Sequence, residues 1–176
     1  MSRDSKRPVI KAATSSHSGI AGLLVALGMA GCAAVFLTPS ERIFEGRANA
    51  TDGDSIRLEN TRIRLKGIDA PELDQICRRG AQAYRCGEHA RDALLSLVIG
   101  RPITCKAAGR DKYRRTLAVC TVGGVDIGSR MVASGWAVSY GDYMSEQRQA
   151  ERRREGLWAG TFELPREWRR AHPIGP

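Results

Sequence analysis

The strongest constraint on the fold of this chain is an alternation of apolar and polar side chains through residues 52–72, which read DGDSIRLENTRIRLKGIDAPE. Apolar residues stand at every second position on both sides of Asn60. This period of two predicts two half-buried strands with a tight connection between them. If the strands pair as a hairpin, the residues that flank them return to one end of the sheet. The sequence therefore predicts an acidic cluster at that end, formed by Asp52, Asp54, Asp69 and Glu72.

Carboxylates gathered in one place repel each other unless protons or a cation join them. Arg64 shares the parity of Arg62 and Lys66, which puts it on the polar face of its strand, near these acids. A hard metal ion together with an anionic substrate accounts for this combination of charges. The alternative is that the charges are solvated on an exposed sheet face. Another apolar segment, at 117–122, follows a second charged cluster that reads DKYRR.

In their order and spacing, the segments DGDS, RIRLKGIDAPE and DKYRRTLAVC resemble the staphylococcal nuclease (thermonuclease) family. The similarity runs from about Phe44 to Trp158. It implies an α+β fold, a five-stranded Greek-key barrel of the OB type with about three helices. The periodicity itself gives only the elements, which are strands at 43–50, 54–59, 62–68, 102–107 and 116–122 and helices near 88–99, 127–134 and 144–155.

The resemblance also implies a role for individual residues. The calcium ligands would be the carboxylates of Asp54 and Asp69 and the main-chain carbonyl of Ala70, with Asp52 near the metal. Glu72 would activate or position water, and the scissile phosphate would be held by Arg64 and Arg115. The nucleotide would contact Lys112 and Tyr113. Base stacking by Tyr140 or Tyr143 is a further expectation, against the alternative that these two rings pack in the core.

Three positions depart from the pattern of the family. Ser55 and Ala70 stand where threonine is usual, and Arg114 stands where glycine is usual. If the turn at Arg114 requires a positive φ, a residue with a side chain costs about 1–2 kcal/mol there. The same side chain adds a cation beside the phosphate site.

The net charge of this 176-residue chain is +9, which suits a polyanionic substrate. Solubility alone is the alternative explanation, because much of the surplus lies in two arginine runs, 152–154 and 169–170, that are expected on a solvated helix or tail. With no His or Cys in the acidic motif, the expected cofactor is Ca²⁺.

Residues 1–42 are expected to form a basic tail, an apolar segment at 20–37 and a short linker. The apolar segment has eighteen residues without a charge, and as a helix it would span roughly 27 Å, close to a bilayer core. Because basic residues precede it, the rest of the chain is expected outside the cytoplasmic membrane. We favour an uncleaved membrane anchor over a cleaved signal peptide or a lipoprotein signal ending at Cys32; a buried core helix is the remaining alternative.

Four cysteines follow this segment, an even number that is typical of two disulfides in an exported domain. Of the three possible connectivities we choose Cys77–Cys86, after the acidic segment, and Cys105–Cys120, between strands that flank the DKYRR loop. A zinc site is disfavoured because the sequence has no C-x-x-C pair. Free buried thiols would be expected if the domain stayed in the cytoplasm.

The resulting hypothesis is a monomeric, calcium-dependent nuclease outside the cytoplasm, acting on DNA and RNA with little sequence specificity. Residues 43–160 would form its domain, and residues 161–176 a tail packed on that domain. One alternative is a non-catalytic OB module that only binds nucleic acid. Another is an accessory role in envelope or exopolysaccharide production, because the C-terminal GLWAGTFELPREWRR resembles bacterial proteins named for such gene clusters.

Overall fold

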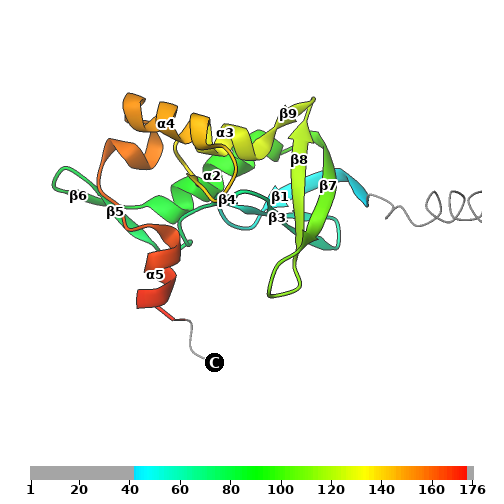
Figure 1. Ribbon diagram of the computed structural model, residues 1–176, viewed down its shortest axis with the longest axis horizontal. Coiled ribbons are helices and arrows are strands. Elements are labelled where there is room, and N and C mark those ends of the chain that lie inside the picture. The colour runs from blue at the N-terminus through cyan, green and yellow to red at the C-terminus, as the bar shows by residue number, and fades with distance from the viewer. Residues whose placement is uncertain (1–41, 174–176) are drawn as a thin grey trace, which may run out of the picture. The chain divides into compact units, whose positions relative to one another are not determined.

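A closed barrel of five strands forms the centre of the domain in the computed structural model, which describes residues 42–173 (Figure 1). Neighbouring strands are antiparallel except β3 and β8, whose parallel pairing closes the barrel. The OB-type barrel expected from the sequence is therefore confirmed. Its strands are β1 (Ile43–Ala50), β2 (Ser55–Leu58), β3 (Thr61–Leu65), β7 (Pro102–Arg110) and β8 (Thr116–Val122).

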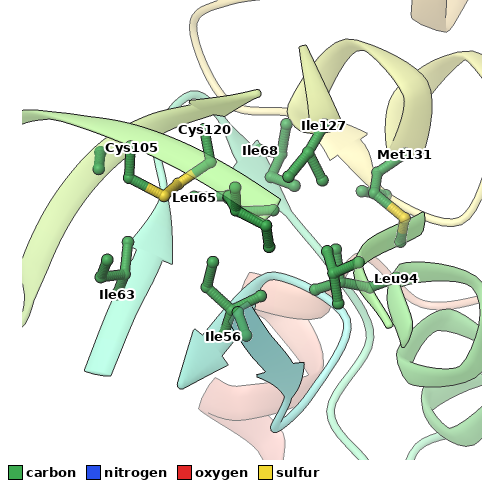
Figure 2. Packing of buried hydrophobic residues seen from close by; sticks show 14 of the residues in the cluster. Ile56, Ile63, Leu65, Ile68, Leu94, Cys105, Cys120, Ile127 and Met131 are labelled. Carbon is green, nitrogen blue, oxygen red and sulfur yellow. A yellow bond between two sulfur atoms is a disulfide. The ribbon is translucent and has the colours of Figure 1, made fainter. Parts of the chain in front are cut away.

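The interior of the barrel is filled by the apolar side chains of the alternating strands (Figure 2). Ile56 of β2 and Ile63 and Leu65 of β3 are all buried. Arg62 and Arg64, which alternate with the two apolar residues of β3, lie on its opposite face. Burial of each such aliphatic side chain contributes about 1.5–3 kcal/mol to folding. This burial fixes the register of β3, and the register in turn fixes the side on which Arg64 projects.

Within residues 42–173 there are four α-helices, where about three were expected. They are α2 (Cys86–Val98), α3 (Ile127–Ala133), α4 (Met144–Arg153) and α5 (Pro165–Ala171), with a 3₁₀ turn, η1, at Gly156–Ala159. Leu94 of α2 and Met131 of α3 contribute to the core over the barrel (Figure 2). The additional helix is α5, within the segment that was expected to be a tail.

Several short strands complete the domain. β4 (Ile68–Asp69) pairs with β10 (Val138–Ser139), and β9 (Val125–Asp126) extends the sheet beside β8. The hairpin formed by β5 (Ile76–Arg79) and β6 (Gln82–Arg85) was not expected from the sequence. Both expected disulfides are present, with Cys77–Cys86 joining β5 to the start of α2 and Cys105–Cys120 joining β7 to β8.

The apolar segment at 20–37 lies outside the described residues, so the predictions made for it are not tested here. Within residues 42–173, none of the helices combines the length and the apolar character needed to span a bilayer.

Candidate active site

A single pocket of about 1130 Å³ gathers the charged clusters that lie far apart in the sequence. The residues just before β2, the strands β3 and β4, and the 111–115 loop all contribute to it. Every residue for which a metal, phosphate or nucleotide role was expected lines this pocket: Asp54, Arg64, Asp69, Ala70, Glu72, Lys112, Tyr113 and Arg115. Asp52 and Tyr140 line it as well.

The centre of the pocket is a pair of buried aspartates bridged by one arginine. Nη1 of Arg64 donates to Oδ1 of Asp54 at 2.7 Å, and its Nη2 donates to Oδ1 of Asp69 at 2.7 Å. The second carboxylate oxygen of Asp54 accepts a hydrogen bond from the backbone N–H of Ala70 at 3.2 Å. These contacts arise because β2 pairs with β3, so that Ser55 lies opposite Arg64.

Burial makes the negative charge of Asp54 costly, and it raises the pKa of that carboxyl to about 7. The Arg64 guanidinium opposes the rise, while Asp52 and Asp69 add to it. The three carboxylates of Asp54, Asp69 and Glu72 share two guanidiniums, those of Arg64 and Arg169, so the cluster keeps an excess of negative charge. The arrangement therefore favours the approach of a further cation.

The donor set at this point consists of oxygen atoms alone, the carboxylates of Asp54 and Asp69 and the main-chain carbonyl of Ala70. Calcium takes six to eight oxygen ligands, including carbonyls and waters, so this chemistry fits calcium. Among the described residues, no three acidic, histidine or cysteine side chains form a metal cage by themselves. Waters and substrate oxygens would have to complete the coordination. Some of the hydrogen bonds that Arg64 and Arg169 make to these carboxylates would have to open for the ion to enter.

The second charged cluster forms a tight turn that aims Arg115 into the pocket. Oδ1 of Asp111 accepts from the backbone N–H of Tyr113 and of Arg115, at 2.9 and 2.8 Å. Its Oδ2 accepts from Nε of Arg115 at 2.6 Å. Asp111 therefore fixes the orientation of the Arg115 guanidinium through its Nε. The turn brings Arg114 to a φ of 65°, the positive value for which glycine is usual.

The tyrosines differ in their placement. Tyr113 is 68% exposed, and two cations lie over its ring, with Nζ of Lys112 at 4.9 Å and Cζ of Arg115 at 5.5 Å from the ring centroid. Tyr140 is 64% exposed at the pocket wall. Tyr143 does not line the pocket; its hydroxyl donates to Asp126 at 2.8 Å and its ring packs against the core. A stacking role thus remains geometrically open for Tyr113 and Tyr140, and the packing alternative applies to Tyr143.

Sequence reasoning missed a third group of cations, which α5 brings to the pocket: Arg166, Arg169 and Arg170. Nη1 of Arg169 donates to Asp69 at 3.1 Å and to Glu72 at 2.9 Å, and its Nη2 donates to Asp69 at 2.9 Å. Glu72, expected to act on water, is therefore paired with a residue that lies 97 positions later in the chain. The one available signal was the clustering of arginines at 166–170.

Comparison with known proteins gives a match to the family described as "Staphylococcal nuclease homologue" over residues 62–160. Succinoglycan biosynthesis protein ExoI of Rhizobium meliloti (strain 1021) is 38% identical over 122 residues, which are 64% of this chain and 63% of that protein. The probable staphylococcal-like nuclease CAN4 of Oryza sativa subsp. japonica is 31% identical over 125 residues, 67% of this chain and 23% of that protein. The chain thus spans less than two thirds of the length of both proteins.

An uncharacterized endonuclease of Haemophilus influenzae is 31% identical over 136 residues, which are 70% of this chain and 71% of that protein. The identity therefore extends over most of a relative of comparable length. The residues matched by the family, 62–160, include β3 and the 111–115 turn, and they end before α5.

Proposed function

Because the chain belongs to the staphylococcal nuclease family, we propose that it is a calcium-dependent nuclease that hydrolyses phosphodiester bonds in DNA and RNA with little sequence specificity. The observation that carries the proposal is the pocket itself, in which buried carboxylates and the cations of two distant segments face the same space. A phosphodiester needs both kinds of group, since an attacking oxygen must approach a centre that is already anionic.

In the proposed reaction, the calcium ion would be held by Asp54, Asp69 and the Ala70 carbonyl. When bound, calcium would neutralise one phosphoryl oxygen and make the phosphorus more electrophilic. Arg64 and Arg115 donate hydrogen bonds to the remaining oxygens, and these bonds strengthen as charge accumulates in the transition state. Asp111 contributes by keeping the guanidinium of Arg115 oriented before substrate arrives.

Glu72 accepts the proton of the attacking water or holds that water in line. Its carboxylate is 34% exposed and is therefore accessible from solvent. Tyr113 offers its exposed face for stacking with a base, an interaction that tolerates any sequence. Low specificity follows from this design, because the contacts are made to phosphate and to the flat faces of bases.

The proposal includes a location outside the cytoplasm. Its support is the pair of disulfides, Cys77–Cys86 and Cys105–Cys120, because disulfides persist chiefly in oxidising compartments. The apolar segment at 20–37, preceded by basic residues, supports the same location and an attachment to the membrane.

A second candidate function, an accessory role in exopolysaccharide production, is favoured by the name of the Rhizobium meliloti relative. The charged groups of the pocket suit a phosphodiester better than a neutral sugar. The non-catalytic alternative, a module that binds nucleic acid without cleaving it, is disfavoured because the complete set of expected catalytic and metal residues lines the pocket.

The test is degradation of plasmid DNA and of RNA by the purified protein, with calcium and with excess chelator. We expect cleavage only with calcium. Asp54→Asn is expected to lower the rate at least roughly a hundredfold, the scale seen when a transition-state charge stabiliser is lost. The control is Asp92→Asn, on the exposed face of α2 and outside the pocket, which should keep the full rate.

Undiminished cleavage in chelator would contradict the calcium requirement. Binding of nucleic acid without cleavage in calcium would favour the non-catalytic module, and neither binding nor cleavage would favour the envelope role.

A further inference from the structure

The C-terminal helix α5 brings three arginines to the pocket from outside the part of the chain that matches the family. It begins with the buried Pro165, a residue suited to the first turn of a helix because its missing N–H would have no partner there. Its arginines lie at 166, 169 and 170. Two of these positions, 166 and 170, are four residues apart, so they share one face of the helix.

The segment that leads into α5 is held by contacts to the residues that follow Glu72. The fully buried Gln75 donates from Nε2 to the carbonyl of Glu163 at 2.7 Å. Arg78 of β5 and Thr161 exchange two backbone hydrogen bonds, of 3.0 and 2.9 Å. Gly160 makes this approach possible, because a Cβ at that position would lie 2.0 Å from the carbonyl oxygen of Arg78. These contacts fix the point from which α5 begins.

Arg169 links the helix directly to the acidic centre through its hydrogen bonds to Asp69 and Glu72. Desolvation lowers the pKa of this guanidinium, but the two carboxylates outweigh it, so that the pKa lies above its ordinary value. Arg169 thus remains charged and holds the side chain of Glu72 in place.

The other two arginines have no comparable partner within the described part of the chain. Arg166 forms an ion pair with Glu167 at 3.9 Å, with about half of each side chain exposed, a pair of the kind that contributes little. Arg170 is exposed and takes part in no hydrogen bond or ion pair that the described residues provide. Both side chains nevertheless line the pocket.

These arginines decide the sign of the charge around the pocket. Eight basic and six acidic side chains line it, and three of the basic ones belong to α5. Without the helix, five basic side chains would face six acidic ones. The lining would then carry a formal charge of −1, whereas with α5 it carries +2, which favours the approach of a polyanion.

We propose that α5 is a nucleic-acid-binding element, in which Arg166 and Arg170 bind substrate phosphates next to the scissile phosphate while Arg169 positions Glu72 and Asp69. The inference rests on the proposed nuclease function and extends it, because it assigns part of the substrate path to a segment outside the family match. Phosphate contacts of this kind carry no sequence information, in keeping with low specificity.

The experiment measures binding of a short fluorescein-labelled single-stranded oligothymidylate by anisotropy, in chelator so that no cleavage occurs, over a series of salt concentrations. The variant is Arg166→Gln/Arg170→Gln in the full chain. The matched control is Arg148→Gln/Arg152→Gln, which removes the same charge at the same spacing from the exposed face of α4, outside the pocket. Circular dichroism checks that both variants are folded.

We expect the α5 variant to bind roughly tenfold more weakly at low salt, with the slope of log affinity against log salt reduced by about 1.4, since each lost contact to a single strand removes about 0.7. The control should stay within about twofold of the unmodified protein. In steady-state cleavage with calcium, the α5 variant should raise KM and leave kcat almost unchanged.

Equal affinity, slope and KM in the two double variants would overturn the role of α5 while leaving the nuclease proposal intact. An unmodified protein that neither binds nor cleaves nucleic acid would overturn the nuclease proposal itself.

Discussion

At the scale of single residues, the position of Glu72 depends on a glycine. Gly87 lies in the first turn of α2, and a Cβ built on it would be 1.7 Å from the carbonyl oxygen of Glu72 and 2.8 Å from Cα of Leu73. No side chain fits in that space. The helix can support the acidic loop at such close range only because this residue has no Cβ.

We therefore predict that Gly87→Ala destabilises the protein, although alanine is the better helix former by about 1 kcal/mol. The overlap involves backbone atoms that cannot rotate away, so the loss in the free energy of unfolding should be about 2 kcal/mol or more. Urea denaturation measures it, and Ser96→Ala on the exposed side of the same helix is the control. A Gly87→Ala protein as stable as the unmodified one would show that the loop is free to move.

The acidic residues and their arginines could be predicted because strand parity and motif spacing carry the information. The sequence also marked Arg114 as a residue that would be strained if its turn required a positive φ, and the turn does have a positive φ there. Arg169 could not be predicted in its role, because its contacts to Asp69 and Glu72 span about a hundred residues and depend on how α5 docks. In the sequence its arginine run is indistinguishable from a solvated tail.

At the scale of elements, the barrel strands follow from the alternation of apolar residues, and α2 follows from its apolar stripe, in which Ala90, Leu94 and Val98 are buried. The hairpin of β5 and β6 gives no such signal. Of its eight strand residues only Cys77 is buried, so the alternation that identifies a strand is missing. What holds this hairpin in place is the disulfide and the bridge to Thr161, neither of which is a local property of its sequence.

The two disulfides should have different effects on function. We predict that Cys77→Ala/Cys86→Ala lowers both stability, by about 2–3 kcal/mol, and oligonucleotide affinity, because it loosens the hairpin that is bonded to the segment before α5. Cys105→Ala/Cys120→Ala should lower stability by about 3 kcal/mol and leave affinity unchanged, because the disulfide that it removes lies within the barrel and outside the pocket. Thermal unfolding and anisotropy together measure both effects. The same loss of affinity in both variants would mean that the hairpin has no special connection to the substrate.

At the scale of the whole molecule, the predicted location can be tested through the redox state. We expect protein recovered from producing cells to contain Cys77–Cys86 and Cys105–Cys120 in oxidised form, as measured by mass spectrometry of non-reduced peptides. Added protease should degrade the domain once the outer barrier of the cells is opened, while a cytoplasmic control protein stays intact. Four free thiols together with protection from protease would contradict the location.

The ion pair between Arg169 and Asp69 joins residues that are 100 positions apart. A ribosome therefore completes the acidic cluster early and delivers its arginine partner among the last residues of the described domain. Until then, the pocket of the nascent chain lacks three of its eight basic side chains. The enzyme that we propose would thus reach its full affinity for substrate only when its synthesis is nearly finished.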